Sequence, residues 1–177
     1  MARAFFSSVL VFLFAVVCAV PTQIDTRQLN PADIINALGI GLVSKIHTII
    51  TLESLTTKLV SIDFDVKNPL PIELTIKEIS SSAGLNGTVY ARFNHTFPAP
   101  GLVVPLLGTK NSGRIDNVLL PLGAVASLEI IPVGFLDLLD TDAKINAATI
   151  FGHLGIPLEL EGLKQEEVPA TYDLSIS

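Results

Sequence analysis

Apolar and polar residues alternate with a period of two on both sides of the pair Asn68-Pro69. The apolar positions of the two runs are Val60, Ile62, Phe64 and Val66, followed by Ile72, Leu74 and Ile76. This period is typical of antiparallel strands that have one face against a core and the other in water. The pattern therefore predicts two half-buried strands joined by a corner at Asn68-Pro69.

Shorter apolar runs, separated by turn residues, fill the remainder of the chain. Asn86-Gly87 is a strong hairpin signal, and a closing hairpin is expected around Gly152 and Gly155. Further strands are expected over residues 46–52, 89–94, 102–107, 115–120, 124–131, 145–151 and 156–160, with a second short helix over 132–139. The spacing predicts a mainly β fold class, an antiparallel β-sandwich of seven to eight strands (fibronectin type III/immunoglobulin-like) with one or two short helices.

Residues 20–43 are expected to form a polar lead-in and a short helix, ahead of a single domain over residues 44–177. Asn30 is a suitable N-cap, Pro31 fits the first helical position, and Asp33 complements the helix dipole. We expect this helix to cover one end of the sandwich. Docking on a membrane or a partner is the alternative, which the lack of cations in the helix disfavours.

The first residues predict a signal peptide over residues 1–19. Arg3 precedes an apolar stretch over residues 5–17, and the small residues Val17-Cys18-Ala19 favour cleavage near Ala19. The apolar stretch is short for a membrane span, and no apolar tail for a lipid anchor is found at the other end. The sequence therefore predicts a secreted, extracellular protein with no stable membrane anchor.

Removal of this segment changes the composition. The only Cys and the only Met leave with it, and the chain has no Trp, so disulfides and thiol chemistry are excluded from the mature protein. About 150 residues suffice for one hydrophobic core, which must supply the stability. Loss of Arg3 lowers the net charge from -6 to -7. Nucleic acid and anionic lipid are poor partners for such a chain, because phosphate binding needs clustered Lys and Arg; a monomer is expected.

Two segments match the N-glycosylation acceptor pattern, Asn86-Gly87-Thr88 and Asn94-His95-Thr96. Asn86 is expected in a turn and Asn94 on the solvent face of a strand. In a secretory pathway we expect at least one of the two to carry a glycan. The alternative for Asn86 is a purely structural role in the hairpin.

Metal and catalytic motifs are weak in this chain. The histidines share no ligand spacing and are expected to be solvated. An acidic cluster near the second predicted helix lacks the glycine and the glutamate of a calcium loop. The paired acids on the exposed strand face have no aromatic-lined cleft for a sugar, and no Gly-x-Ser-x-Gly elbow occurs. We therefore expect no enzyme, catalytic residue, metal or cofactor. The residues weighed are His47, His95 and His153; Asp137, Asp140 and Asp142; and Asp63 and Asp65.

Asn68 and Pro69 are predicted to form a structural motif. Pro69 removes an amide donor and disfavours helix at Asn68, so the strand ladder pauses there. The Asn68 side chain can bond the backbone two residues on and hold the corner. A recognition loop for proline-binding partners is the alternative.

The order of these elements resembles one known family. An alternating strand, Val66-Lys67-Asn68-Pro69, a second alternating strand, Asn86-Gly87 and a late hairpin over 145–160 are similar to the late embryogenesis abundant group 2 family (WHy-type, water stress and hypersensitive response) over residues 44–168. The resemblance implies a β-sandwich with a short helix and a protective role during water stress, here in a small secreted member. The chain departs from the family pattern in its secretion signal, its glycosylation sites and the lack of a longer Asn-Pro-Asn motif.

Two functional hypotheses follow. The first is a non-catalytic secreted glycoprotein that resembles the stress-protective, desiccation-related proteins and acts through its surface on an unknown protein or cell-wall partner. The alternative is a binding module for an apolar ligand such as lipid or sterol. The abundance of Ile, Leu and Val and the apolar run over 102–107 motivate the alternative. The same residues could also simply fill the core.

Overall fold

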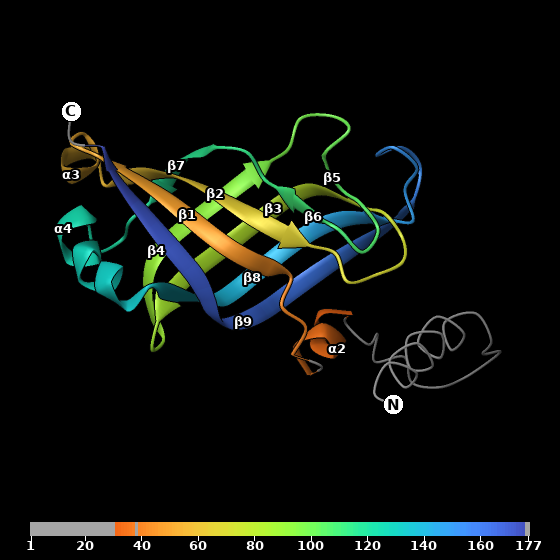
Figure 1. The fold of residues 1–177 in the computed structure, drawn as a ribbon, viewed down its shortest axis with the longest axis horizontal. Helices are drawn as coiled ribbons and strands as arrows, with labels where there is room; N and C mark the ends of the chain where they lie inside the picture. The colour runs from red at the N-terminus through yellow and green to blue at the C-terminus, as the bar shows by residue number, and fades with distance from the viewer. Residues whose placement is uncertain (1–30, 38, 176–177) are drawn as a thin grey trace.

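In the computed structural model, which describes residues 31–37 and 39–175, the strands form one continuous sheet that closes on itself (Figure 1). The strands are β1 (Val43–Thr51), β2 (Leu59–Lys67), β3 (Leu74–Leu85), β4 (Thr88–Thr96), β5 (Leu102–Val104), β6 (Thr109–Asn111), β7 (Ile115–Leu119), β8 (Phe135–Ala147) and β9 (Ile156–Ser175). The helices are α2 (Pro31–Ala37), α3 (Ser54–Thr57), α4 (Ala124–Ser127) and the 3-10 helix η1 (Leu128–Val133). The predicted signal peptide, the Ala19 cleavage point and Asn30 lie outside the described residues.

The mainly β prediction is confirmed, but the sandwich is not, because the sheet closes into a barrel. Strands are hydrogen-bonded in the order β1-β9-β8-β3-β4-β7-β2, and β2 pairs again with β1. These seven strands form the barrel, while β5 and β6 pair on β3 and β2 outside the ring. β1 and β9 run parallel, and every other pair is antiparallel. A sandwich and a barrel both have one apolar face, so the period of two does not distinguish them.

The long strand β9 closes the ring. The last predicted strand ends at residue 160, whereas β9 extends to Ser175. Its first part pairs with β8 up to Pro169, and its last part pairs with β1 from Ala170 onward. Pro169 has no amide hydrogen to donate, and it lies where the strand changes partner. One continuous strand thus joins β8 to β1.

The segment before β8 corrects two predicted elements. Residues 124–131, expected as a strand, form α4 and most of η1, and residues 132–139, expected as a helix, contain the start of β8. Buried positions recur every three residues at Ala124, Ser127 and Ile130, which is helical spacing. Gly134, at φ 76°, ends η1 in the left-handed region. The consecutive apolar residues concealed this period in the sequence.

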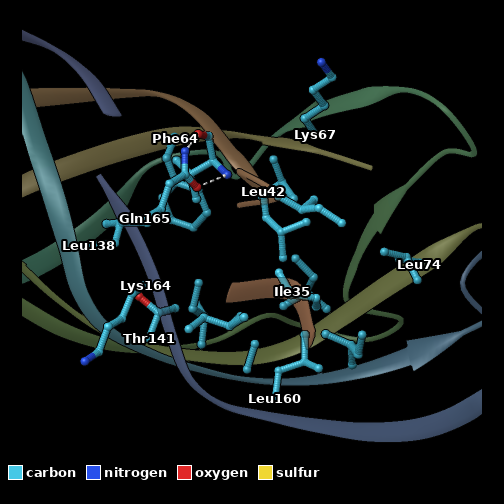
Figure 2. Close-up of a pocket in the computed structure, with 18 residues that line it drawn as sticks. Ile35, Leu42, Phe64, Lys67, Leu74, Leu138, Thr141, Leu160, Lys164 and Gln165 are labelled. Atoms are coloured by element: carbon cyan, nitrogen blue, oxygen red, sulfur yellow. Dashed lines mark hydrogen bonds between the residues drawn. The ribbon is translucent and has the colours of Figure 1, made fainter. Parts of the chain in front are cut away.

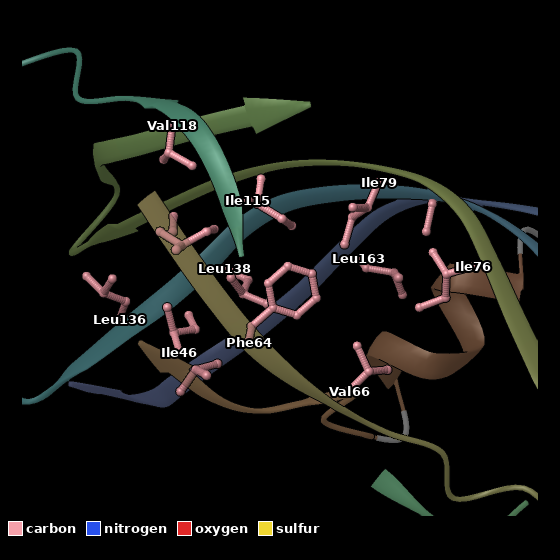
Figure 3. Packing of buried hydrophobic residues seen from close by; sticks show 14 of the residues in the cluster. Ile46, Phe64, Val66, Ile76, Ile79, Ile115, Val118, Leu136, Leu138 and Leu163 are labelled. Atoms are coloured by element: carbon pink, nitrogen blue, oxygen red, sulfur yellow. The ribbon is translucent and has the colours of Figure 1, made fainter. Parts of the chain in front are cut away.

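Apolar side chains fill the barrel interior. Phe64 is 4% exposed, and its ring points inward toward the region of Leu138 and Leu163 (Figure 3). The Phe64 ring centre lies 6.0 Å from that of Phe93, within the range of favourable aromatic pairs. Burial of such a side chain stabilises the fold by roughly 1.5–3 kcal/mol. Core packing therefore accounts for the stability of a barrel in which the described residues contain no Cys.

Asn68 is a buried polar side chain, 1% exposed, that makes several hydrogen bonds to the backbone. Its amide nitrogen donates to the carbonyls of Ile72 (2.7 Å) and Pro105 (3.1 Å). Its amide oxygen accepts from the backbone N–H of Leu70 at 3.0 Å, which is the bond expected two residues on. The backbone N–H of Asn68 also donates to Gly108 at 2.8 Å. One side chain thereby joins the β2–β3 corner to the segment after β5.

Candidate functional site

Two adjoining cavities inside the barrel form the candidate site. The first has a volume of about 70 Å³ and the second of about 50 Å³. Both have apolar walls, and they lie on the two sides of a partition whose residues line both of them. The shared residues are Val43, Phe64, Ile79, Leu138 and Thr141.

The inward positions of β3 show how the cavities follow one another along the barrel. Leu74, Ile76 and Ile79 line the first cavity, and Ile79, Ser81 and Ala83 line the second. Alternate residues of a strand face the same side, and a register shift between Ile76 and Glu78 moves the inward series from Ile76 to Ile79. One strand thus supplies a continuous wall. The alternation seen in the sequence around Leu74 and Ile76 therefore builds this site. The cavity itself depends on side chains from other strands and was not predicted.

Hydroxyl groups interrupt the apolar wall at one level. The Ser81 and Thr141 hydroxyls are hydrogen-bonded to each other at 2.6 Å across β3 and β8, and both residues are buried. Thr48 of β1 also lines the second cavity. A buried polar group needs a hydrogen-bond partner, and Ser81 and Thr141 satisfy each other. The wall at this level is polar without being charged.

Helix α2 covers the end of the barrel at the first cavity. Ile35 of this helix lines that cavity (Figure 2). Ala32, in the first turn of the same helix, is fully buried. The Asn36 amide nitrogen donates to the Gly162 carbonyl at 2.8 Å, and its oxygen accepts from the Lys164 N–H at 2.9 Å. A single side chain thus binds the backbone of β9 as a neighbouring strand would. The sequence predicted a helix at one end of the fold, and Asn36 shows how it is held.

Gln165 completes the same end. Its amide oxygen accepts from the Val43 N–H at 3.0 Å, and its amide nitrogen donates to the Val43 carbonyl at 2.6 Å, as the dashed lines in Figure 2 show. These bonds join β9 to the start of β1, ahead of the parallel ladder that begins at Ile46. Neither Asn36 nor Gln165 was singled out from the sequence, because their roles depend on a distant strand.

Two lysines stand at the rim of the first cavity. Lys67 and Lys164 contribute to its wall, but their ammonium groups point away from the interior (Figure 2). Of the described residues that line the second cavity, none has an ionisable side chain. An ionised ligand group inside the barrel would have no opposite charge to compensate for lost hydration. The site is therefore suited to an uncharged apolar molecule.

The predicted glycosylation residues lie away from this site. Asn86 and Asn94 are both exposed and stand at opposite ends of β4. Asn86 (φ 50°) and Gly87 (φ 79°) form the tight turn of the β3–β4 hairpin, as both left-handed conformations require. The geometry leaves both side chains accessible to an enzyme. Attachment of a glycan stays a prediction.

His47 and Asp63 form an ion-pair geometry on the barrel exterior. The His47 Nδ1 lies 2.9 Å from the Asp63 Oδ2, across the β1–β2 pair. Partial burial would raise the pKa of Asp63, but hydrogen bonds from Asn111 and His47 outweigh it and lower the pKa. Asn111 also donates to Asp65 at 2.8 Å. Among the described residues, no group of three or more His, Cys, Asp and Glu side chains could hold a metal ion.

The acidic cluster lies within a strand, and the prediction that it stands near a helix end is wrong. Asp137, Asp140 and Asp142 lie along β8. The Asp137 carboxylate accepts from the Glu167 N–H, and that of Asp142 accepts from the Gly162 N–H, both at 2.9 Å. These carboxylates bind amides of β9 close to the register shifts of the β8–β9 pair. They have a structural role in this sheet.

The buried hydroxyl group of Tyr172 is predicted to destabilise the folded state. Its hydroxyl is buried and has no hydrogen-bond partner among the described residues. We expect Tyr172→Phe to raise the free energy of unfolding by about 1–3 kcal/mol, the usual penalty of an unsatisfied buried group. Urea unfolding at neutral pH measures this change, and an unchanged or lower value would contradict it.

The same residue gives a test at alkaline pH. Burial raises the pKa of Tyr172 from 10.0 to about 12. A raised folded-state pKa contributes stability below the unfolded pKa, and this contribution is lost as pH rises through the folded value. Stability should therefore fall between pH 10 and 12 more steeply in the natural protein than in Tyr172→Phe. Equal slopes in that window would show that Tyr172 does not cause the loss.

Comparisons with known proteins do not show a family for this chain. No family model matches the chain, and no curated protein matches it. Among solved structures, it is similar to a protein from Archaeoglobus fulgidus, with 11% sequence identity, a TM-score of 0.32, and coverage of 68% of this chain and 94% of that one. A likeness at this level carries no argument about function. The resemblance to late embryogenesis abundant group 2 stays a prediction.

The described helices are short. None of them is both long enough and apolar enough to cross a lipid bilayer.

Proposed function

We propose that this chain is a non-catalytic, secreted binding protein that holds a slender, uncharged apolar ligand inside its barrel. The observation that carries the proposal is the pair of adjoining apolar cavities, which share the walls around Phe64. Ligand sites are typically concave and mostly apolar, with a few placed polar groups. The Ser81–Thr141 hydroxyl pair, at 2.6 Å, is such a group.

The size of the cavities narrows the ligand class. A dry cavity of roughly 150 Å³ accepts a molecule the size of benzene. At about 70 and 50 Å³, each cavity alone is smaller than that. A ligand that uses both must be thin and must pass the Phe64 ring. This favours an alkyl chain over the fused rings of a sterol.

Helix α2 is the proposed access point. It lies over the first cavity, and its bonds to the barrel include the two made by the Asn36 side chain. Breaking a few side-chain bonds is easier than opening a strand ladder, so the helix can move without loss of the barrel. A chain-like ligand could then enter beside Ile35.

Secretion, glycosylation and stress protection, which the sequence predicts, relate differently to this proposal. Secretion and glycosylation at Asn86 or Asn94 are compatible with an extracellular carrier. Protection during water stress, or binding to a cell-wall partner, stays a prediction for which no described contact argues. The apolar-ligand hypothesis has a specific feature in its favour, and we therefore place it first.

A cavity-filling variant tests the proposal. Ala143 faces the first cavity and is 8% exposed. Ala143→Leu adds three carbon atoms in that direction and should weaken binding of a neutral, chain-like fluorescent dye, the methyl ester of the linear polyene parinaric acid, by about tenfold or more, since each buried methylene is worth about 0.8 kcal/mol. Dye fluorescence in a titration measures the affinity.

The matched control is Ala126→Leu. Ala126 is half-buried in α4 and lines neither cavity, so the same added atoms should leave dye affinity unchanged. Thermal unfolding of both variants shows that they fold. Equal dye binding by Ala143→Leu and the natural protein, or no binding by the natural protein, would contradict the proposal.

A further inference from the structure

A strongly exposed apolar loop joins β8 to β9. Phe151 is 84% exposed, Leu154 is 79% exposed and Ile150 is 62% exposed. Residues 147–158 contain no Asp, Glu, Lys or Arg. Scattered exposed apolar residues are normal, but a contiguous charge-free group of this kind marks an interaction site.

The loop is fastened so that these side chains project outward. The Glu73 carboxylate accepts from the Thr149 hydroxyl at 2.8 Å and from the Gly152 N–H at 2.9 Å. Ile150 and His153 exchange two backbone hydrogen bonds of 3.0 Å. Gly152 lies so close to Val103 that an added Cβ would come within 2.7 Å of its methyl group. The loop is thus held against the barrel, with its large side chains left in water.

A second apolar turn leaves the barrel at the same end. Leu106 and Leu107, between β5 and β6, are 57% and 68% exposed. Leu74 of β3 pairs with Val104, the last residue of β5, and with Ala147, the last residue of β8. Both apolar turns therefore begin at the same height along the barrel. Two strand spacings separate them, roughly 10 Å. We call Ile150, Phe151, Leu154, Leu106 and Leu107 the apolar tip.

We propose that the apolar tip docks the protein on an uncharged, zwitterionic lipid surface. The tip consists of two narrow turns, whereas a stable protein interface needs a face of roughly 800 Å² on each partner. Phe and Leu side chains gain by entering the boundary between head groups and acyl chains. The net charge of -6 and the absence of cations in residues 147–158 argue against an anionic surface. Docking through the tip does not require a ligand in the barrel.

The opposite end of the barrel provides a comparison. Val125 is 70% exposed and Leu122 is 50% exposed, at α4 and the turn before it. The charged residues Lys58 and Glu129 occur at this end, next to α3 and in η1. A membrane interface would have to remove water from such groups, at a cost in free energy. This end is therefore the natural control.

Sedimentation with phosphatidylcholine vesicles tests the inference on the full chain. The variant combines Phe151→Asn with Leu154→Asn, because both positions have positive φ (50° and 61°) and asparagine tolerates that conformation. The natural protein should sediment with the vesicles. The fraction of the variant bound to the vesicles should correspond to a partition coefficient at least about tenfold lower. The control combines Val125→Gln with Leu122→Gln and should bind like the natural protein.

The possible results distinguish a zwitterionic lipid surface from other partners of the apolar tip. Failure of the natural protein to sediment, or equal losses in the variant and the control, would overturn the proposal. So would stronger binding to vesicles that contain phosphatidylserine. A natural protein that elutes as a dimer, and becomes a monomer in the tip variant, would assign the tip to a second copy of this chain instead. Dye binding by the tip variant should be unchanged, so loss of docking is distinguishable from loss of the cavity.

Discussion

Replacing Phe64 with alanine is expected to lower the free energy of unfolding by about 3–5 kcal/mol, the usual range for a buried phenylalanine. Phe64 is 4% exposed, and its ring separates the two cavities and pairs with Phe93 at 6.0 Å. Loss of the ring would leave one continuous void in place of two small ones. The free energy of unfolding of a small domain is only about 5–15 kcal/mol, so this variant would lose a large part of its stability.

Urea unfolding at neutral pH measures the effect of Phe64→Ala. Phe151→Ala is the matched control, because the same atoms are removed from a side chain that is 84% exposed, and its change should stay within about 0.5 kcal/mol. If Phe64→Ala remains folded, the joined cavity should bind the same chain-like polyene dye more tightly. A loss of stability below about 1 kcal/mol would show that Phe64 is not a core residue.

Asn68→Ala is expected to lower the free energy of unfolding by about 3 kcal/mol. The substitution removes the donor to the Ile72 and Pro105 carbonyls and the acceptor of the Leu70 N–H. Buried groups left without a partner cost about 1–3 kcal/mol each, and water cannot easily replace a side chain that is 1% exposed. The corner between β2 and β3 should loosen first.

Unfolding in urea and amide hydrogen exchange together measure this prediction. Exchange should accelerate at Leu70 and Asn68 before the strands far from the corner respond. Asn94→Ala, in protein without glycans, is the control, since Asn94 is exposed and its loss should change stability by less than about 0.5 kcal/mol. Equal effects at the two asparagines would rule out a special role for the corner.

Parts of the fold were predictable from local sequence. The strands around Asn68-Pro69 and the Asn86-Gly87 hairpin follow from the period of two and from turn chemistry, which act between near neighbours. The segment over 124–139 was assigned wrongly, because consecutive apolar residues satisfy a strand and a helix equally well. Ala124, Ser127 and Ile130 show their period of three only once burial is known.

The candidate site was predictable only in part. The apolar-ligand hypothesis came from composition, and Phe64 was already placed on the inward face of its strand. The residues that organise the barrel end, Asn36 and Gln165, bond to backbone more than a hundred residues away. No local pattern marks such a pair. Ser81 and Thr141, which meet at 2.6 Å across two strands, were equally hidden.

By itself, the sequence determined that this chain is mainly β, that its strands are half-buried, and that Asn68-Pro69 makes a corner. Each of these follows from neighbours in the chain, whose side chains alternate between core and water. Only the tertiary structure decided that the sheet closes. Closure requires the parallel pairing of β1 with the end of β9, between residues such as Ile46 and Ala170. The cavities were decided in the same way, since a void is the volume that side chains from several distant strands fail to fill.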